Sequence, residues 1–397
     1  HRVRLRLDPL GRITHRYLAR NGAETLRARS VYGETAPPGG NLRGRLWRSY
    51  DGAGLSESLG FDFAGNLIAA ARHLVADDRT APDWAALDGL MTGAALDAAA
   101  APLLAPGERY LSRTAYDALG RPVQAVMPHR ADMRPSVVQL GYAPGGLPQT
   151  LDLWLRRDRA PDALLAPDTA TRRIVRGSRH DAKGQRLLLS LGNDVEIRHA
   201  YDPETFHPRR ITADRGAGWP AAARNVQDLG YAYDAVGNFT RIIDDSDLQG
   251  AVFFRNRRVE PGMDFTYDAA YRLTLARGRE HLGQAGGALL PPTPGADGDG
   301  GRERLAHPGD GLAMGIYQER YAHDDAGNLR RVSHGADSGS WQREMFYESA
   351  SLIEPGATGN RLDRMTASGQ PDAAFAHDAQ GRMTAMPHLS RNQVPDR

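Results

Sequence analysis

The stretch that decides the fold is Tyr233-Asp234-Ala235-Val236-Gly237-Asn238-Phe239, and it recurs with small changes along the 397-residue chain. An aspartate accepts hydrogen bonds from the backbone two residues later, and a glycine three residues later takes the positive φ of a tight loop. The aromatic residue before the aspartate is suited to the end of a strand. The stretch therefore predicts a β-hairpin loop.

Clear copies of this stretch place a glycine three residues after an aspartate, and we predict these ten residues to be the structural turns of the fold: Asp62 and Gly65, Asp117 and Gly120, Asp234 and Gly237, Asp324 and Gly327, Asp378 and Gly381. Weaker copies contain Asp8, Asp51 and Asp181, while Asp202 and Asp268 lack the glycine. The clear and weaker copies together contain ten aspartates. The spacing from each of them to the next lies within two residues of a multiple of 11. Short strands joined by turns every 8–12 residues have this spacing.

Residues between the loops alternate with a period of two, as Val195, Ile197 and His199 do against Glu196 and Arg198. Such alternation indicates strands with two different faces. The sequence therefore predicts an all-β fold, a long antiparallel sheet of hairpins that extends over 1–397 as one repeat segment.

Two segments depart from the repeat. Residues 82–101 contain Trp84, Leu87, Met91, Ala94 and Ala95 at helical spacing, which predicts a short helical insertion. Residues 283–315 are rich in Gly, Pro and Asp, which predicts a long exposed loop.

Composition removes several classes of function. The chain has no Cys, and its only lysine, Lys183, is followed by Gly184, so a disulfide framework, a thiolate site and a P-loop are excluded. The net charge of +2 argues against a nucleic-acid partner in spite of clustered arginines. No apolar run is long enough to span a membrane as a helix.

The carboxylates leave two chemical alternatives to a structural turn. The Asp-x-x-Gly loops or the pair Asp297 and Asp299 could bind calcium through oxygen ligands, and dispersed carboxylates could form a glycosidase pair. Most of the loops carry only one carboxylate, however, and a role in the turn is the stronger interpretation. We therefore assign no catalytic, cofactor-binding or metal-binding residue and expect no cofactor.

Longer stretches of the chain resemble the YD-repeat, or Rhs, proteins, and among them the C component of insecticidal Tc toxin complexes. The resemblance covers most of the chain and is most specific in four places: Asn41–Gly44 leading into Tyr50–Leu55, Gly192–Val195 with Tyr201–Thr205, Gln227–Leu229 followed by Tyr231–Asn238, and Phe265–Asp268 through Gly278–His281.

This resemblance implies a function for the sheet. In the family a spiralling sheet forms a hollow shell around a toxic polypeptide, usually the C-terminal part of the same protein, until delivery. It implies a secreted or exported bacterial virulence protein whose partners are that cargo and a B-type shell component or a secretion apparatus. The chain shows no signal peptide, and the family's self-cleaving aspartate core is expected downstream of Met386-Pro387-His388-Leu389, so the segment itself is expected to be non-enzymatic.

One other function remains open from the sequence. The same repeats could form an extracellular adhesin that binds carbohydrate or a cell-surface partner. Aromatic residues gathered on one exposed face would favour glycan binding, whereas aromatic residues stacked between neighbouring hairpins would favour the shell.

Overall fold

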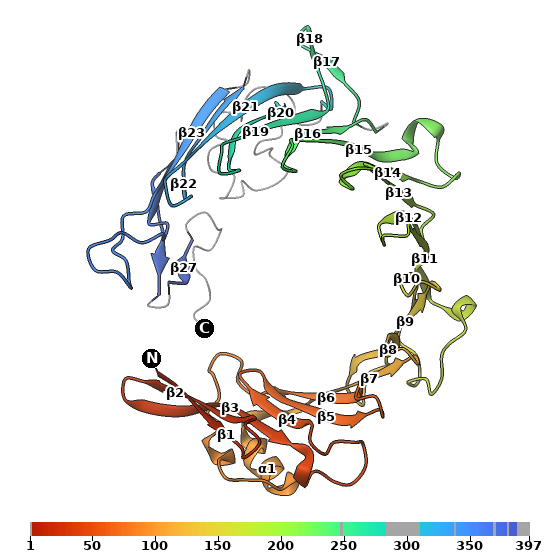
Figure 1. Ribbon diagram of the computed structural model, residues 1–397, viewed down its shortest axis with the longest axis vertical. Coiled ribbons are helices and arrows are strands. Elements are labelled where there is room, and N and C mark those ends of the chain that lie inside the picture. Colours follow the sequence, from red (N-terminus) through yellow and green to blue (C-terminus); the bar gives the residue numbers. More distant parts are fainter. Residues whose placement is uncertain are drawn as a thin grey trace. The chain divides into compact units, whose positions relative to one another are not determined.

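The computed structural model describes residues 2–246, 249–282, 310–336, 339–367, 371–378 and 381–386 (Figure 1). The predicted loop 283–315 therefore lies almost entirely outside the described residues, as do Asp297 and Asp299. The chain divides into two compact units between Asn193 and Asp194.

The first unit is built from twelve strands that pair antiparallel in sequence order. They are β1 (Arg2–Leu7), β2 (Ile13–Arg20), β3 (Ala23–Tyr32), β4 (Leu46–Asp51), β5 (Gly54–Phe61), β6 (Leu67–Val75), β7 (Leu104–Tyr116), β8 (Pro122–His129), β9 (Val137–Tyr142), β10 (Pro148–Trp154), β11 (Arg172–His180) and β12 (Arg186–Leu191). Because each strand pairs with the next, this unit is a meander.

The second unit continues the same plan. Its strands are β13 (Glu196–Tyr201), β14 (Pro208–Asp214), β15 (Asn225–Tyr233), β16 (Phe239–Asp244), β17 (Val252–Phe254), β18 (Arg257–Val259), β19 (Gly262–Tyr267), β20 (Leu273–His281), β21 (Met314–His323), β22 (Leu329–Ala336), β23 (Gly339–Phe346), β24 (Arg364–Ala367), β25 (Ala373–Ala374), β26 (Ala376–His377) and β27 (Met383–Ala385). The hairpin β17–β18 stands apart from the meander, so β16 pairs directly with β19. The pair β26–β27 is also separate.

Among the described residues, helical structure is confined to short pieces: the α-helix α1 (Gly93–Ala100) and the 3-10 turns η1 (Gly33–Thr35), η2 (Ala85–Leu87), η3 (Ala101–Leu103), η4 (Pro167–Thr169) and η5 (Ala221–Ala223). The predicted all-β fold with a long antiparallel sheet and one short helix is thus confirmed. No helix in the described ranges is long and apolar enough to cross a membrane.

The helix occupies only the second half of the segment 82–101. Gly89 has a φ of 77°, which ends the turn begun at η2, and Met91 is half exposed. Trp84, Leu87 and Leu96 are fully buried against the face of β3 to β5, and the indole N–H of Trp84 donates to the carbonyl of Asp51 at 3.1 Å. These contacts form the largest apolar core of the first unit.

The second unit buries fewer and smaller side chains. Its buried apolar residues among those described lie along separate strands or beside them: Ala213, Val259, Ala276, Leu282, Ala313, Val332 and Met345. Hydrogen bonds between strands and pairs of side chains across them must therefore supply much of its stability. The bidentate ion pair of Arg210 with Asp228, at 2.6 and 2.5 Å across β14 and β15, is one such pair.

Candidate functional site: the ladder of hairpin loops

The loop of Asp234 shows the geometry that the repeat encodes. Asp234 Oδ1 accepts from the backbone nitrogens of Val236 and Asn238, at 3.0 and 2.9 Å, and Oδ2 accepts from the side-chain amide of Asn238 at 2.9 Å. The nitrogen of Gly237 donates to the carbonyl of Asp234 at 3.2 Å, and Gly237 has a φ of 95°. One carboxylate thus holds the whole loop.

The other aspartate and glycine pairs singled out in the sequence occupy equivalent loops. A glycine of positive φ donates its backbone nitrogen to the aspartate carbonyl in each loop, at Gly65, Gly120, Gly327 and Gly381. The residue after the glycine is Asn or Arg because its side chain must donate to the second carboxylate oxygen. Arg121 donates through Nε to Asp117 Oδ2 at 2.8 Å in this way, as Arg382 does to Asp378 at 2.7 Å.

In the two copies without glycine, another residue takes the positive φ of the loop. In the loop of Asp268, Tyr271 occupies the glycine position with a φ of 62°. In the loop of Asp202 the turn is one residue longer, and Phe206 takes the positive φ, 62°. The left-handed conformation is therefore a property of the loop position rather than of glycine itself.

Hydrogen bonding to the charged form lowers the pKa of two of these carboxylates, Asp62 and Asp117. The side-chain amide of Asn66 is the main cause that lowers the pKa of Asp62. The Arg121 guanidinium likewise lowers the pKa of Asp117. Both oxygens of such a carboxylate already accept hydrogen bonds from its own loop, as Asp234 shows, so these aspartates are poor candidates for metal ligands. No group of three potential ligands gathers anywhere in the described part of the chain.

Neighbouring loops are joined by tyrosine hydroxyls, a feature that the sequence did not reveal. In each case a tyrosine lies at or next to the last residue of a strand. Its hydroxyl donates to the backbone carbonyl of the first residue of a strand in the preceding hairpin. Five such bonds, from 2.7 to 3.2 Å, are Tyr32 to Ile13, Tyr116 to Leu67, Tyr142 to Pro122, Tyr233 to Pro208 and Tyr347 to Leu329.

Arginines reinforce the same contacts. The guanidinium of Arg121, which is held by Asp117, lies 4.3 Å from the ring centre of Tyr142 in the next hairpin, and Arg12 lies 4.0 Å from that of Tyr32. In the second unit, Arg272 donates to the carbonyl of Asp324 at 2.8 Å. Several of these loops therefore form, within each unit, a ladder in which one hairpin supports the next. We call this arrangement the loop ladder.

A second cluster that the sequence did not reveal lies across β20 to β23. His334, with a side chain only 1% exposed, has Nδ1 at 3.0 Å from Glu319 and Nε2 at 3.3 Å from Glu280. Its ring is stacked on Trp341 with the ring centres 5.0 Å apart. The residues are 61 positions apart at most but share one face, so only the strand register brings them together. The cluster ties four strands rather than forming an open site.

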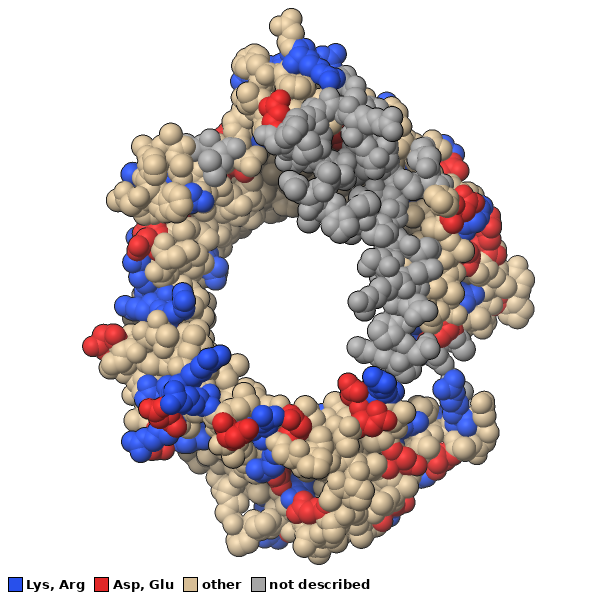
Figure 2. Space-filling view, turned by 180° about the vertical axis from the view of Figure 1, so that it is seen from behind, with Lys and Arg blue, Asp and Glu red and all other residues tan. Residues whose placement is uncertain are grey.

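Charged side chains of both signs are mixed on the surface. Figure 2 shows basic and acidic side chains close to one another over the visible face. Many are cross-strand pairs, for example Arg198 with Asp214 at 3.4 Å and Arg331 with Glu344 at 2.9 Å. The arginine-rich strands thus carry ion pairs.

Comparison with known proteins agrees with this geometry. No family model matches the chain. It is 29% identical to toxin subunit YenC1 of Yersinia entomophaga over 294 residues, which cover 74% of this chain and 26% of YenC1. It is also 29% identical to toxin subunit YenC2 of the same organism over 301 residues, 75% of this chain and 27% of YenC2. The chain thus spans about a quarter of the length of these relatives.

Solved structures share the fold. A crystal structure of TcdB2-TccC3-TEV matches 94% of this chain and 16% of its own with a TM-score of 0.67 and 22% identity. The structure of the Tc holotoxin pore of Photorhabdus luminescens matches 96% of this chain and 16% of its own chain, with a TM-score of 0.68 and 21% identity. The crystal structure of TcdB2-TccC3 without its hypervariable C-terminal region matches 94% of this chain and 18% of its own chain, with a TM-score of 0.64 and 21% identity.

Proposed function

We propose, from the premise that this chain is a homologue of Tc toxin subunits, that it forms a non-enzymatic segment of a shell that encloses and protects a toxic polypeptide until delivery. The cargo is the C-terminal part of the same precursor, and a B-type component or a secretion apparatus is the partner. The protein acts after export from the bacterium.

The loop ladder is the observation that supports a shell most directly. A wall one sheet thick cannot rely on a deep core, so its strands need another source of register and stiffness. Tyrosine and arginine contacts between neighbouring loops supply it in both units. The rings of Tyr32 and Tyr142 lie against arginines of the adjacent hairpin, an arrangement that favours the shell over a glycan-binding adhesin.

Balanced charge also suits a container. An enclosed polypeptide of arbitrary sequence would be repelled or trapped by a wall of one charge sign. Exposed ion pairs such as Arg331 with Glu344 avoid both outcomes. We infer that the wall holds its cargo without a strong electrostatic preference.

Protease protection of the full-length protein tests this function. We expect the C-terminal polypeptide to stay intact at a protease concentration that digests the same polypeptide expressed alone, and to be digested once the shell is unfolded by heat. Denaturing gels taken beforehand report whether the polypeptide is already cleaved from the shell. Equal digestion rates for the native protein and the isolated polypeptide would contradict encapsulation.

A further inference from the structure

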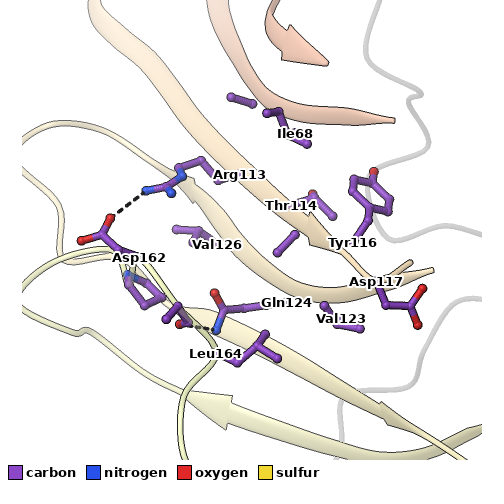
Figure 3. A pocket seen from close by; sticks show the side chains of 14 residues that line it. Ile68, Arg113, Thr114, Tyr116, Asp117, Val123, Gln124, Val126, Asp162 and Leu164 are labelled. Atoms are coloured by element: carbon purple, nitrogen blue, oxygen red, sulfur yellow. Dashed lines mark hydrogen bonds and ion pairs between the residues drawn. The ribbon is translucent and has the colours of Figure 1, made fainter. Parts of the chain in front are cut away.

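Two segments outside the repeat pack on the same face of the first unit's sheet. Residues 82–101 cover β3 to β5, and the segment 155–171 covers β8 to β10. Arg113 of β7 pairs with Asp162 of the second segment, with 3.7 Å between nitrogen and oxygen (Figure 3). The register of β4 to β7 places both segments on one face, which Figure 1 shows to be the convex one. We call the opposite, concave face of this unit the open face.

The open face is polar where it crosses β3 to β5. Ser30, Ser49 and Ser56 lie directly opposite one another on these three strands. Ser56 in turn lies opposite Arg72 on β6, and the guanidinium of Arg72 pairs with Asp51 at 2.7 Å. Polar side chains are what an antiparallel sheet carries on a face that water solvates.

The same face becomes apolar on β8 to β12, as the register through β6 to β8 shows. Half-buried aliphatic residues lie opposite one another there: Ala125, Val138, Leu140, Leu151, Leu153, Val175 and Leu191. We call these seven residues the apolar patch. Their neighbours in sequence on the covered face, such as Val137, Gln139 and Asp152, are buried. The patch keeps part of its surface exposed because the two covering segments lie on the other face.

The apolar patch has the composition of a binding surface. On β9 and β10 the open face carries leucine and valine where β4 and β5 carry serine. A contiguous apolar surface left exposed on a sheet marks a place where another molecule binds. None of the seven residues has a charged or hydrogen-bonding side chain. A matching ligand therefore offers apolar side chains and is not selected by its charge.

We propose that the apolar patch binds apolar side chains of the enclosed toxic polypeptide. The identity of this occupant rests on the proposed function, because a container meets its cargo on the concave side, whereas the apolar character of the patch does not. The matching segment of the cargo is one that is not packed into a folded core, since a folded domain keeps most of its large apolar side chains inside. The wall of the first unit thus has a region that binds apolar segments beside a region, around Ser49, that does not.

Site-specific photocrosslinking in the full-length protein tests this assignment. The photoreactive residue p-benzoylphenylalanine replaces Leu151 in the apolar patch, Ser49 in the polar part of the open face, or Leu164 on the convex side, which is 58% exposed. After irradiation, mass spectrometry of the digested protein identifies the cargo peptides joined to each position. Leu151 should yield about tenfold more cargo adduct than Ser49, the factor that burial of one leucine-sized side chain supplies, and Leu164 should yield none.

A second substitution makes the test specific for the patch. Leu140 lies directly opposite Leu151, so Leu140→Gln in the Leu151 crosslinking variant should lower the cargo adduct about tenfold. The matched control is Ser30→Gln, which places the same side chain in the polar part of the open face and should leave the adduct unchanged. Protease protection reports whether each variant is folded, and a crosslinker at Leu140 gives the same readout if the Leu151 variant is not.

Equal cargo adduct at Leu151 and Ser49, or an adduct insensitive to Leu140→Gln, would overturn the patch as a binding surface. Adduct of Leu151 with another copy of the chain or with a second shell component in place of the cargo would overturn the cargo as its occupant. Because protease protection is measured separately, a protected cargo without adduct at Leu151 would refute only the role of the patch, while an unprotected cargo would refute encapsulation itself.

Discussion

Acidification from pH 7 to pH 5 is expected to loosen the first unit through His15. The ring is 4% exposed, and its removal from water, with Arg29 nearby, lowers the pKa of His15 from 6.5 to about 4 despite Asp88 at 3.3 Å. Between these two pKa values His15 is protonated in the unfolded chain but neutral in the folded chain. Its neutral form therefore contributes its full share to the free energy of unfolding above pH 6.5, and this share is lost as the pH falls toward 4. The loss between pH 7 and pH 5 amounts to about 2 kcal/mol.

Hydrogen exchange of the β2 and β3 amides measures this loss locally. After correction for intrinsic exchange, protection should fall about 30-fold over that interval. His15→Phe keeps a ring beside Tyr17, whose ring centre lies 5.8 Å away in a stacked arrangement, but cannot titrate. The variant should therefore lose most of the pH dependence. If wild type and variant lose protection equally, His15 is not the group responsible.

Three further changes test the turns and the loop ladder. Tyr271→Gly should raise the free energy of unfolding by about 1 kcal/mol, because Tyr271 is 60% exposed and held at a φ of 62°; urea unfolding that shows a loss would contradict this. Gly192→Ala should cost about 1–3 kcal/mol, since its Cβ would lie 1.5 Å from the carbonyl oxygen of Arg173, whereas Gly177→Ala meets nothing within 4 Å and serves as the control in thermal melts. Tyr142→Phe removes the hydroxyl bond to the adjacent hairpin and should cost about 1 kcal/mol, which hydrogen exchange in β8 and β9 would detect; unchanged exchange would show that this bond is dispensable.

The hairpins could be predicted from the sequence because the contacts that form each loop join residues close together in the chain. The carboxylate of Asp234 and all its partners lie within five residues, so their spacing is visible along the chain. The short helix was predicted for a similar reason, although Gly89 confines it to the second half of the segment.

Contacts between strands could not be predicted in the same way. Tyr116 donates to Leu67, 49 residues earlier, and nothing in either residue marks the other as its partner. Gln124 and Gln139 bind the backbone of Ala163 and Leu165 together only because β8 and β9 place the two glutamines directly opposite each other. Such contacts depend on register, which spacing along the chain does not specify.

The loop ladder explains how the repeat signature can fade while the fold persists. After Tyr142 the chain has Ala143 where an aspartate would stand, yet its backbone closes the same loop, with Ala143 N to Leu147 O at 2.9 Å and Gly146 N to Ala143 O at 2.8 Å. Support comes instead from the preceding hairpin, because Arg121 lies over the ring of Tyr142. A loop that is held by its neighbour needs less from its own side chains. The aspartate is thus free to be lost in some copies, provided that the adjacent loop keeps its arginine and the tyrosine stays.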